Sequence, residues 1–304
     1  MNKTSGRWKL GFVLALLTAM LWGVLPIALK IALKSIDPYT VTWYRFASSA
    51  LILAIVLGLT RSLPDIGKFD RRTWILMAIA FVGLTGNYVL YIVALVHTFP
   101  TLTQTVAQLG PMILLLGGLV VFKEKFSGLQ WLGFAMLMAG LALFFHDKLI
   151  ELSHITGDLG LGVLFLTLAS FIWAAYGLAQ KRLLRTLGPQ QILLILYLGA
   201  GLVLIPAASP ASVRQADTLQ LSMLAFCCLN TLVAYGAFAE GLKHWEVSRF
   251  GAVLATAPLF TVAGMWIVGR FAPNLVAAER LDALSILGTL LVVLGSVTCA
   301  IARR

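Results

Sequence analysis

Long apolar stretches alternate with short polar segments along nearly the whole chain. Each stretch has roughly 19–23 residues, and about 20 residues of helix cross a ~30 Å hydrocarbon core. The polar segments between them are too short for a separate water-soluble domain. The pattern predicts an all-α integral membrane protein with ten transmembrane helices, at residues 10–29, 39–59, 74–96, 101–122, 128–146, 159–180, 190–208, 218–239, 249–268 and 283–302.

The second half of the chain repeats landmarks of the first half in the same order. The matched pairs are 151 residues apart for Trp22/Trp173, Lys30/Lys181 and Pro38/Pro189, 147 apart for Tyr88/Tyr235, His97/His244 and Pro111/Pro258, and 155 apart for Glu124/Glu279, Gly133/Gly288 and Gly140/Gly295. The larger last spacing places eight extra residues within 270–277. Because five helices is an odd number, a second copy would cross the membrane in the opposite direction. We therefore predict two inverted five-helix repeats, residues 1–146 and 147–304, an arrangement common in carriers.

Composition excludes a water-soluble protein. Only 12% of the residues are charged and 60% are hydrophobic, whereas soluble domains carry roughly 25% charged residues. An N-terminal span at 10–29 could be mistaken for a secretory signal, but it is too long and has no small-x-small cleavage site. The three cysteines fall in predicted spans without metal-ligand spacing and are interpreted as core residues.

The net charge of +11 indicates membrane orientation rather than binding to nucleic acid. If the N-terminus is cytoplasmic, the alternating spans place 16 Lys and Arg residues on the cytoplasmic side and six on the other, with Arg45 inside a span. This excess follows the positive-inside rule. The expected location is a bacterial inner membrane, with the lipid bilayer as partner, several crossings and both termini cytoplasmic.

The ordered motifs resemble the drug/metabolite transporter superfamily, of the ten-helix EamA type. The resemblance covers nearly the whole chain and is carried by Trp22-Gly23, Arg45, Pro111, Phe122-Lys123-Glu124-Lys125, Gly133 and Gly140, and in the second copy by Trp173, Pro258, Glu279, Gly288 and Gly295. The second copy departs from the pattern at Ala174 and Leu196, which stand where Gly23 and Arg45 stand in the first. The resemblance implies a secondary carrier, commonly an exporter of amino acids or other small metabolites.

Aromatic and amide side chains lie well inside the predicted spans, where interfacial belts do not explain them. They are Trp22, Asn87, Tyr88, Tyr91, Trp173, Tyr176 and Tyr235. One interpretation is an aromatic-lined substrate cavity near the midplane, and the other is packing between helices. The lining set slightly favours a zwitterion, an amine or a moderately apolar metabolite over a multiply charged anion.

Arg45 is the only charged side chain deep in a predicted span, seven residues into it. It could hold the carboxylate of a substrate, because a charge at that depth must be paired or hydrated. The alternative, which we favour from sequence, is a structural anchor whose side chain reaches the interface or binds carbonyls at a helix end.

Prolines and nearby amides suggest breaks in three spans. Pro26, Pro111 and Pro258 each remove a backbone hydrogen bond, so we expect kinks or hinges there. Gln108 is a candidate for the substrate path, with hydrogen bonding between helices as the alternative.

Helix ends and helix contacts have their own candidates. Gly133 with Gly140, and Gly288 with Gly295, lie on one face and predict close packing of spans 128–146 and 283–302, within one chain or between two. A homodimer is therefore compatible with the sequence but is not required. Glu124 and Glu279, at span ends beside basic residues, are expected to serve gating salt bridges or folding.

No carboxylate falls in the middle of a span, and His97 and His244 lie at span ends. A facilitator or exchanger therefore fits somewhat better than a proton antiporter. An intramembrane enzyme would need an acid pair, a zinc motif or a nucleophile with a base, and a channel would need charge rings or a filter loop. We see none of these motifs, so we expect no enzyme activity, cofactor or metal, while a structural or sensory membrane protein stays open as an alternative.

Overall fold

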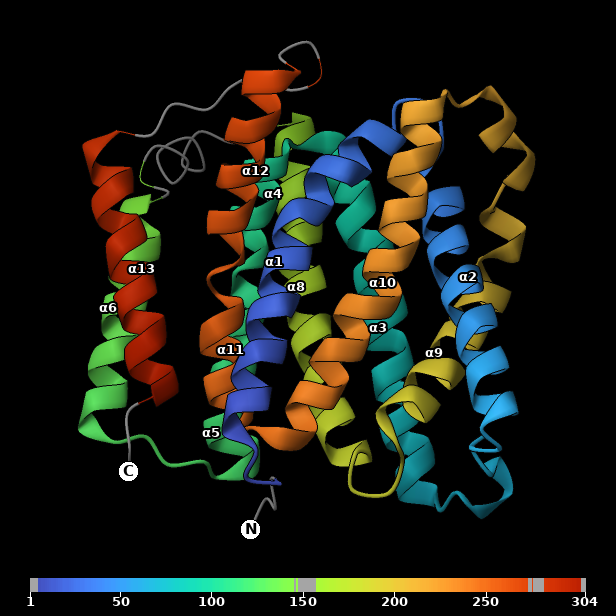
Figure 1. Ribbon diagram of the computed structural model, residues 1–304, viewed down its shortest axis with the longest axis horizontal. Helices are drawn as coiled ribbons and strands as arrows, with labels where there is room; N and C mark the ends of the chain where they lie inside the picture. The colour runs from blue at the N-terminus through green and yellow to red at the C-terminus, as the bar shows by residue number, and fades with distance from the viewer. Residues whose placement is uncertain (1–4, 145, 147–156, 273–274, 276–281, 302–304) are drawn as a thin grey trace.

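The computed structural model describes residues 5–144, 146, 157–272, 275 and 282–301, and this part of the chain contains helices and no strand. Figure 1 shows the helices standing side by side as an upright bundle. The first half of the chain forms α1 (Trp8–Ala32), α2 (Pro38–Leu59), α3 (Arg71–His97), α4 (Pro100–Ala107), α5 (Leu109–Phe122) and α6 (Gly128–Phe144). The second half forms α8 (Gly157–Leu183), α9 (Pro189–Leu204), α10 (Thr218–His244), α11 (Val247–Leu254), α12 (Ala257–Phe271) and α13 (Ala283–Ile301). Short 3-10 turns are η1 (Ile66–Lys68), η2 (Ile205–Ala207) and η3 (Pro210–Gln215).

The helices fall on the predicted apolar stretches. Within the described residues, nine helical segments are long and apolar enough to cross a membrane when α4–α5 and α11–α12 are each counted once. The helix at 128–144 is apolar but has 17 residues, which corresponds to roughly 25 Å at 1.5 Å per residue. The protein is therefore an all-α membrane protein, as the sequence predicts.

Aspartates start three of the long helices. Asp37, Asp70 and Asp217 each accept a hydrogen bond from the backbone N–H three residues later, at 2.8–2.9 Å. This is the preferred N-cap arrangement, because the carboxylate satisfies an N–H group that has no partner inside the helix. The hydrogen bonds from Thr73 lower the pKa of the Asp70 carboxyl.

Two of the long segments are broken near their middle. The first break is at Gln108, between α4 and α5, and the second is at Ala255 and Thr256, between α11 and α12. Each break begins three residues before a proline, Pro111 or Pro258. The reason is that a proline ring clashes with the carbonyl four residues earlier and offers it no N–H. Pro26, in contrast, lies within one continuous helix, α1.

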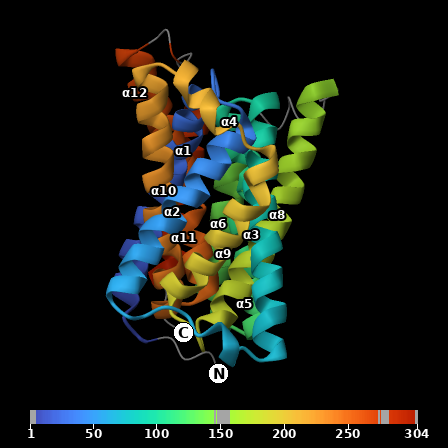
Figure 2. The ribbon, with the colours of Figure 1, turned by 90° about the vertical axis from the view of Figure 1, so that its right-hand side faces the viewer.

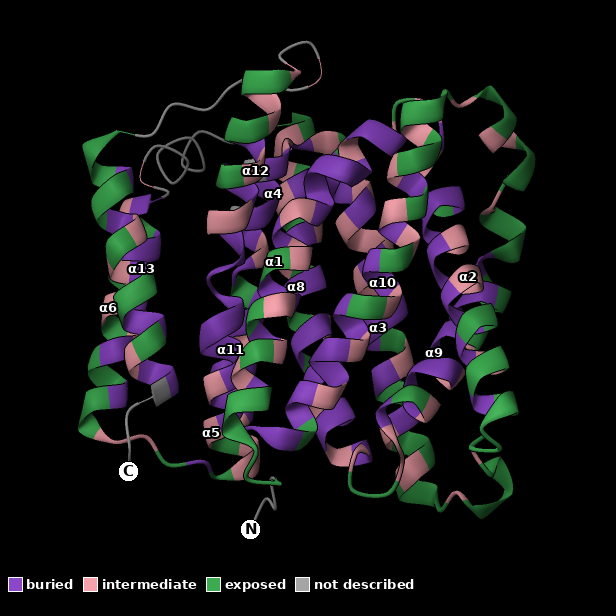
Figure 3. Cartoon of the chain, in the orientation of Figure 1, coloured by how far each residue is buried: buried purple, intermediate pink, exposed green. Residues whose placement is uncertain are grey.

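The bundle is assembled from helices far apart in the sequence. α3 packs along α8, α1 along α10, and α2 along α9, so each close pair joins the two halves of the chain. The views in Figures 1 and 2 agree with these pairs. Figure 3 shows buried residues facing inward and exposed ones facing outward. The exposed surface includes large apolar side chains such as Leu59, Val120 and Leu202, as expected of helices that face lipid.

α6 and α13 form a separate closely packed pair (left in Figure 1). A Cβ added to Gly288 would lie 2.4 Å from the backbone nitrogen of Phe144, and one added to Gly140 would lie 2.6 Å from that of Val292. No side chain larger than hydrogen fits at such distances. The small residues therefore bring these two helices together within one chain, which is the first of the two arrangements that the sequence allows.

We expect Gly288→Leu to separate α6 from α13 and to lower the stability of the protein by about 1–3 kcal/mol, the usual range for overpacking. The measurement is the thermal unfolding temperature of the protein purified in detergent. The control is Gly128→Ala, because a Cβ at Gly128 meets no atom within 4 Å. Equal unfolding temperatures for the two variants would contradict this packing.

Candidate functional site

One cavity of about 90 Å³ lies inside the bundle. Its walls come from α1, α2, α3, α4, α5, α8 and α10, together with residues at the break between α11 and α12. Most lining residues belong to the helix halves on the side away from the N-terminus (Figure 1). The lining consists of Trp22, Leu25, Arg45, Asn87, Tyr88, Tyr91, Gln104, Ala107, Gln108, Gly110, Pro111, Leu166, Ala169, Ser170, Trp173, Tyr235, Leu254 and Ala257.

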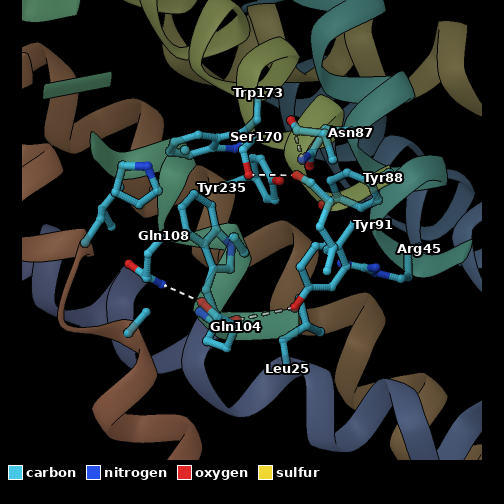
Figure 4. A pocket seen from close by; sticks show the side chains of 18 residues that line it. Leu25, Arg45, Asn87, Tyr88, Tyr91, Gln104, Gln108, Ser170, Trp173 and Tyr235 are labelled. Atoms are coloured by element: carbon cyan, nitrogen blue, oxygen red, sulfur yellow. Dashed lines mark hydrogen bonds between the residues drawn. The ribbon is translucent and has the colours of Figure 1, made fainter. Parts of the chain in front are cut away.

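Four aromatic rings from four different helices meet at this cavity (Figure 4). The rings of Trp22 and Trp173 lie edge to face with centroids 5.4 Å apart, and Trp22 lies 4.9 Å from Tyr235. Tyr88 continues the cluster at 5.3 Å from Tyr235. Such contacts hold the rings in fixed orientations and present an apolar wall to a ligand. The indole nitrogen of Trp22 is buried without a hydrogen-bond partner in the described part of the chain.

The Arg45 side chain is only 3% exposed and lies in the cavity wall. Its Nε donates a hydrogen bond of 2.9 Å to Thr231 Oγ1 on α10, and its guanidinium lies 4.4 Å from the centre of the Tyr88 ring. The guanidinium therefore faces the interior, and the interpretation that it reaches the membrane interface is wrong. A cation over an aromatic face is stabilised by the ring quadrupole, but this replaces only part of the lost hydration.

Amide groups line the wall beside Arg45. Tyr91 Oη donates a long hydrogen bond of 3.4 Å to Gln104 Oε1, and Gln108 Nε2 donates to the Gln104 carbonyl at 3.2 Å. Asn87 Nδ2 donates to the carbonyl of Ala169 across the α3–α8 contact, at 3.1 Å. Gln108 Oε1 is buried and has no partner among the described residues, so this acceptor is available to a ligand.

The prolines act on the backbone of residues that line the cavity. Without an N–H, Pro26, Pro111 and Pro258 leave the carbonyls of Trp22, Ala107 and Leu254 without their usual donor four residues later. All three of those residues line the cavity. Backbone irregularity at membrane depth is tolerated where it lines a cavity. The three prolines therefore contribute to the site through the backbone, although only Pro111 lines it directly.

The structure brings eight of the nine residues predicted for the substrate path around this single cavity. The exception is Tyr176, which is fully buried and packs against Tyr235 and Phe238, with ring centroids 6.0 and 5.9 Å away. Among the lining residues not predicted are Gln104 and Ser170. Gln104 is four residues before Gln108 and Ser170 is three before Trp173, so helical spacing could have pointed to both.

The polar groups of the cavity have apolar counterparts in the second half of the chain. At the spacing of 147 residues, Asn87, Tyr91, Gln104 and Gln108 correspond to Ala234, Phe238, Gly251 and Ala255, and at 151 residues Arg45 corresponds to Leu196. All five counterparts are buried. The polar recognition groups therefore come mainly from the first half of the chain.

The start of α11 is held by a charged side chain. Glu124, which is buried, accepts hydrogen bonds from the backbone nitrogens of Val247 at 3.0 Å and Ser248 at 2.9 Å, at the start of α11. Its contacts are therefore with a helix N-terminus, where a negative charge is favoured, and not with the neighbouring basic residues. Glu279 lies outside the described residues.

Two lysines bind the carbonyls at the ends of α3 and α10. Lys30 Nζ donates to the carbonyls of Leu95 and Thr98 at 2.8 and 2.7 Å. Lys181 Nζ donates in the same way to the carbonyls of Leu242 and Trp245. Cations are favoured at helix C-termini, so both lysines fasten helix ends within their own half of the chain.

His97 and His244 lie at helix ends and do not line the cavity. His97 is the last residue of α3, and His244, the last of α10, contacts Glu240 Oε1 at 2.7 Å. Among the described residues, no carboxylate lines the cavity, and no group of three or more His, Cys, Asp or Glu could hold a metal ion.

The model of the EamA-like transporter family matches the chain twice, at residues 9–146 and again at 160–300. Together these matches span most of the sequence. This chain belongs to the EamA-like transporter family.

Relatives of this EamA-family protein cover almost its whole length. An uncharacterized transporter of Haemophilus influenzae is 38% identical over 295 residues, 97% of this chain and 96% of the relative. The uncharacterized inner membrane transporter YhbE of Escherichia coli K12 is 38% identical over 296 residues, 97% of this chain and 92% of the relative. A probable amino-acid metabolite efflux pump of Escherichia coli K12 is 25% identical over 301 residues, 93% of this chain and 92% of the relative.

One solved structure, described only as the crystal structure of a protein, superposes on this EamA-family protein with a TM-score of 0.69. It is 18% identical in sequence and the match covers 95% of this chain and 96% of that one. At this identity the match concerns the fold alone. The family model and the relatives show that this EamA-family protein is a multi-pass inner-membrane protein of a transporter family, and not an enzyme.

Proposed function

We propose that this protein is a secondary carrier that exports small metabolites, such as amino acids or related compounds, by alternating access. The observation that carries the proposal is the cavity between Trp22, Arg45 and Trp173, which is buried in the bundle and has both aromatic walls and unpartnered polar atoms. Ligand sites commonly combine an apolar lining with a few polar groups of this kind. A purely structural membrane protein has no need of such a cavity.

The proposed architecture is ten transmembrane helices in two inverted five-helix repeats, residues 1–146 and 147–304. Matching contacts support it. Lys30 and Lys181 bind the ends of α3 and α10 in the same way, Asp70 and Asp217 cap the starts of those helices, and both halves contain a proline-broken segment. Two matches to one family model point in the same direction. The asymmetry of the Lys and Arg residues supports cytoplasmic termini.

Alternating access requires one side of the cavity to be closed while the other is accessible. The polar lining lies on the side of the aromatic cluster away from the N-terminus. On the side toward the N-terminus, Tyr176 packs against Tyr235 and Phe238, and Phe238 packs against Phe250. We propose that rocking of the two repeats about the breaks near Pro111 and Pro258 opens this packed layer. Glu124 would hold α11 in the closed arrangement through the backbone of Val247 and Ser248.

The proposal also includes a direction of transport and a class of substrate. Export of amino-acid-like compounds is favoured by the relative described as a probable amino-acid metabolite efflux pump. The described residues that line the cavity include no carboxylate or histidine, which favours facilitated diffusion or exchange over proton coupling.

The experiment that tests the proposal is untargeted metabolite analysis of the medium around cells that overproduce the protein. The control cells contain an equal amount, in the membrane, of a variant in which Trp22 and Trp173 are both replaced by alanine. We expect at least one small metabolite to accumulate outside only with the intact protein. Identical media, with equal amounts of both proteins in the membrane, would contradict export.

A further inference from the structure

The positive charge of Arg45 has no acidic partner in the described part of the chain. Its Nε donates a hydrogen bond to Thr231 Oγ1, and Thr231 in turn donates to the Cys227 carbonyl. None of the ion pairs between described residues includes Arg45. A buried cation without an anion is costly, so an occupant that supplies the anion is favoured.

Two other cations of the bundle, one buried and one half-buried, show what a purely structural cation looks like. Lys181 is 6% exposed and donates to two backbone carbonyls. Lys30 likewise donates to two. Arg45, in contrast, donates to one hydroxyl and lies over one aromatic face, and among the described residues we find no hydrogen bond from it to a backbone carbonyl. Helix-end anchoring therefore does not explain Arg45.

The surroundings of Arg45 suit a carboxylate. The planar guanidinium presents parallel N–H groups that match two carboxylate oxygens. Around the same cavity, Trp22 Nε1 is an unpartnered donor, and the hydroxyl of Tyr91 is engaged only by the long contact to Gln104. Leu196, the counterpart of Arg45 in the second half, is apolar, so the site provides for one anionic group and not for two.

We propose that Arg45 binds the carboxylate of the transported compound, so that a ligand needs one carboxylate to enter the site and does not need a positive charge. The inference rests on the proposed carrier function and specifies its substrate class. It narrows the class suggested by composition, since amines and neutral apolar metabolites are excluded.

The test uses compounds in which the carboxylate and the ammonium charge are removed separately on the alanine, valine and phenylalanine skeletons. Each skeleton is offered as the free amino acid, the N-acetyl acid, the amino acid amide and the N-acetyl amide. Binding is measured from ligand-induced thermal stabilisation of the purified full-length protein. For at least one skeleton we expect both carboxylates to stabilise the protein, and both amides to bind at least about tenfold more weakly, because a lost ion contact in a buried site costs at least the ~1.4 kcal/mol of a tenfold change.

The same panel is applied to Arg45→Gln and to the control Arg182→Gln. Arg182 lies at the far end of α8, over the Phe122 ring at 5.8 Å, and does not line the cavity. We expect the preference for carboxylates to vanish in the first variant and to persist in the second. Ligand-free Arg45→Gln should unfold no earlier than the intact protein, because an unpaired buried charge has been removed, whereas Lys181→Met should unfold earlier.

Three results would overturn the inference. They are equal or stronger binding of the amides, an unchanged carboxylate preference in Arg45→Gln, and no stabilisation by any compound of the panel. Carboxylate binding without export of any metabolite from cells would leave the inference intact and count against the carrier function. Export of an amine or a neutral compound would support the carrier function and count against the inference about Arg45.

Discussion

Cells that produce the protein with Trp22→Ala and Trp173→Ala are expected to export its metabolite at least about tenfold more slowly than cells with the intact protein. The two indoles form the edge-to-face contact, 5.4 Å between centroids, at the wall of the cavity. Removing both deletes a large part of the contact surface of a ligand and the pairing that orients the neighbouring Tyr235. An aromatic pair contributes about 0.5–1.5 kcal/mol beyond its buried area, and burial of a large apolar side chain contributes about 1.5–3 kcal/mol, which together are consistent with a tenfold or larger effect.

The measurement is the initial rate of appearance of the metabolite in the medium, divided by the amount of protein in the membrane. The matched control is Trp131→Ala with Trp266→Ala. These two tryptophans are 48% and 61% exposed on the outside of the bundle, and neither lines the cavity. Normal export by the cavity variant, at normal membrane level, would eliminate the aromatic cavity as the substrate path.

Glu124→Ala is expected to destabilise the protein by about 3 kcal/mol or more, because two hydrogen bonds to a charged group are lost and each contributes ~1.5–3 kcal/mol. Both bonds connect the end of α5 to the start of α11 across the two halves of the chain. The expected results are a lower amount of protein in the membrane and a lower unfolding temperature. Any protein that remains should show altered transport kinetics, since α11 would no longer be fastened.

Glu124→Gln keeps one oxygen acceptor and should give an intermediate result. Asp65→Ala is the matched exposed acid: its ion pair with Lys68, at 2.7 Å, is open to water on both sides, so its removal should change little. Unchanged membrane level together with unchanged kinetics in Glu124→Ala would contradict a role at the helix start.

The helices could be predicted from the sequence because each is specified by a local run of apolar residues. Every apolar stretch of membrane length is helical in the described part of the structure, two of them with a break, and Asp37, Asp70 and Asp217 begin helices as short polar side chains do. The exact positions of the two helix breaks were harder to predict from the sequence. They lie before Pro111 and Pro258 rather than at them, because the clash acts on the preceding turn.

For the cavity, the residue types were predictable from sequence but their directions were not. Trp173 and Tyr176 share a helix face, yet the second lies about 4.5 Å farther along the axis and packs against Phe238, away from the cavity. The direction of Arg45 depends on Thr231, 186 residues away, and the partners of Glu124 are 123 and 124 residues away. Contacts of that kind follow from how the helices assemble and leave no local pattern.

The central claim is that this protein itself moves a small metabolite through the cavity between Trp22, Arg45 and Trp173. It is tested most directly by counterflow in liposomes that contain only the purified protein and are preloaded with the unlabelled exported compound. The account predicts transient uptake of labelled compound with the intact protein and with the Trp131→Ala, Trp266→Ala control, and uptake at the level of empty liposomes with the Trp22→Ala, Trp173→Ala variant. Equal counterflow by the cavity variant, or none by the intact protein, would contradict it.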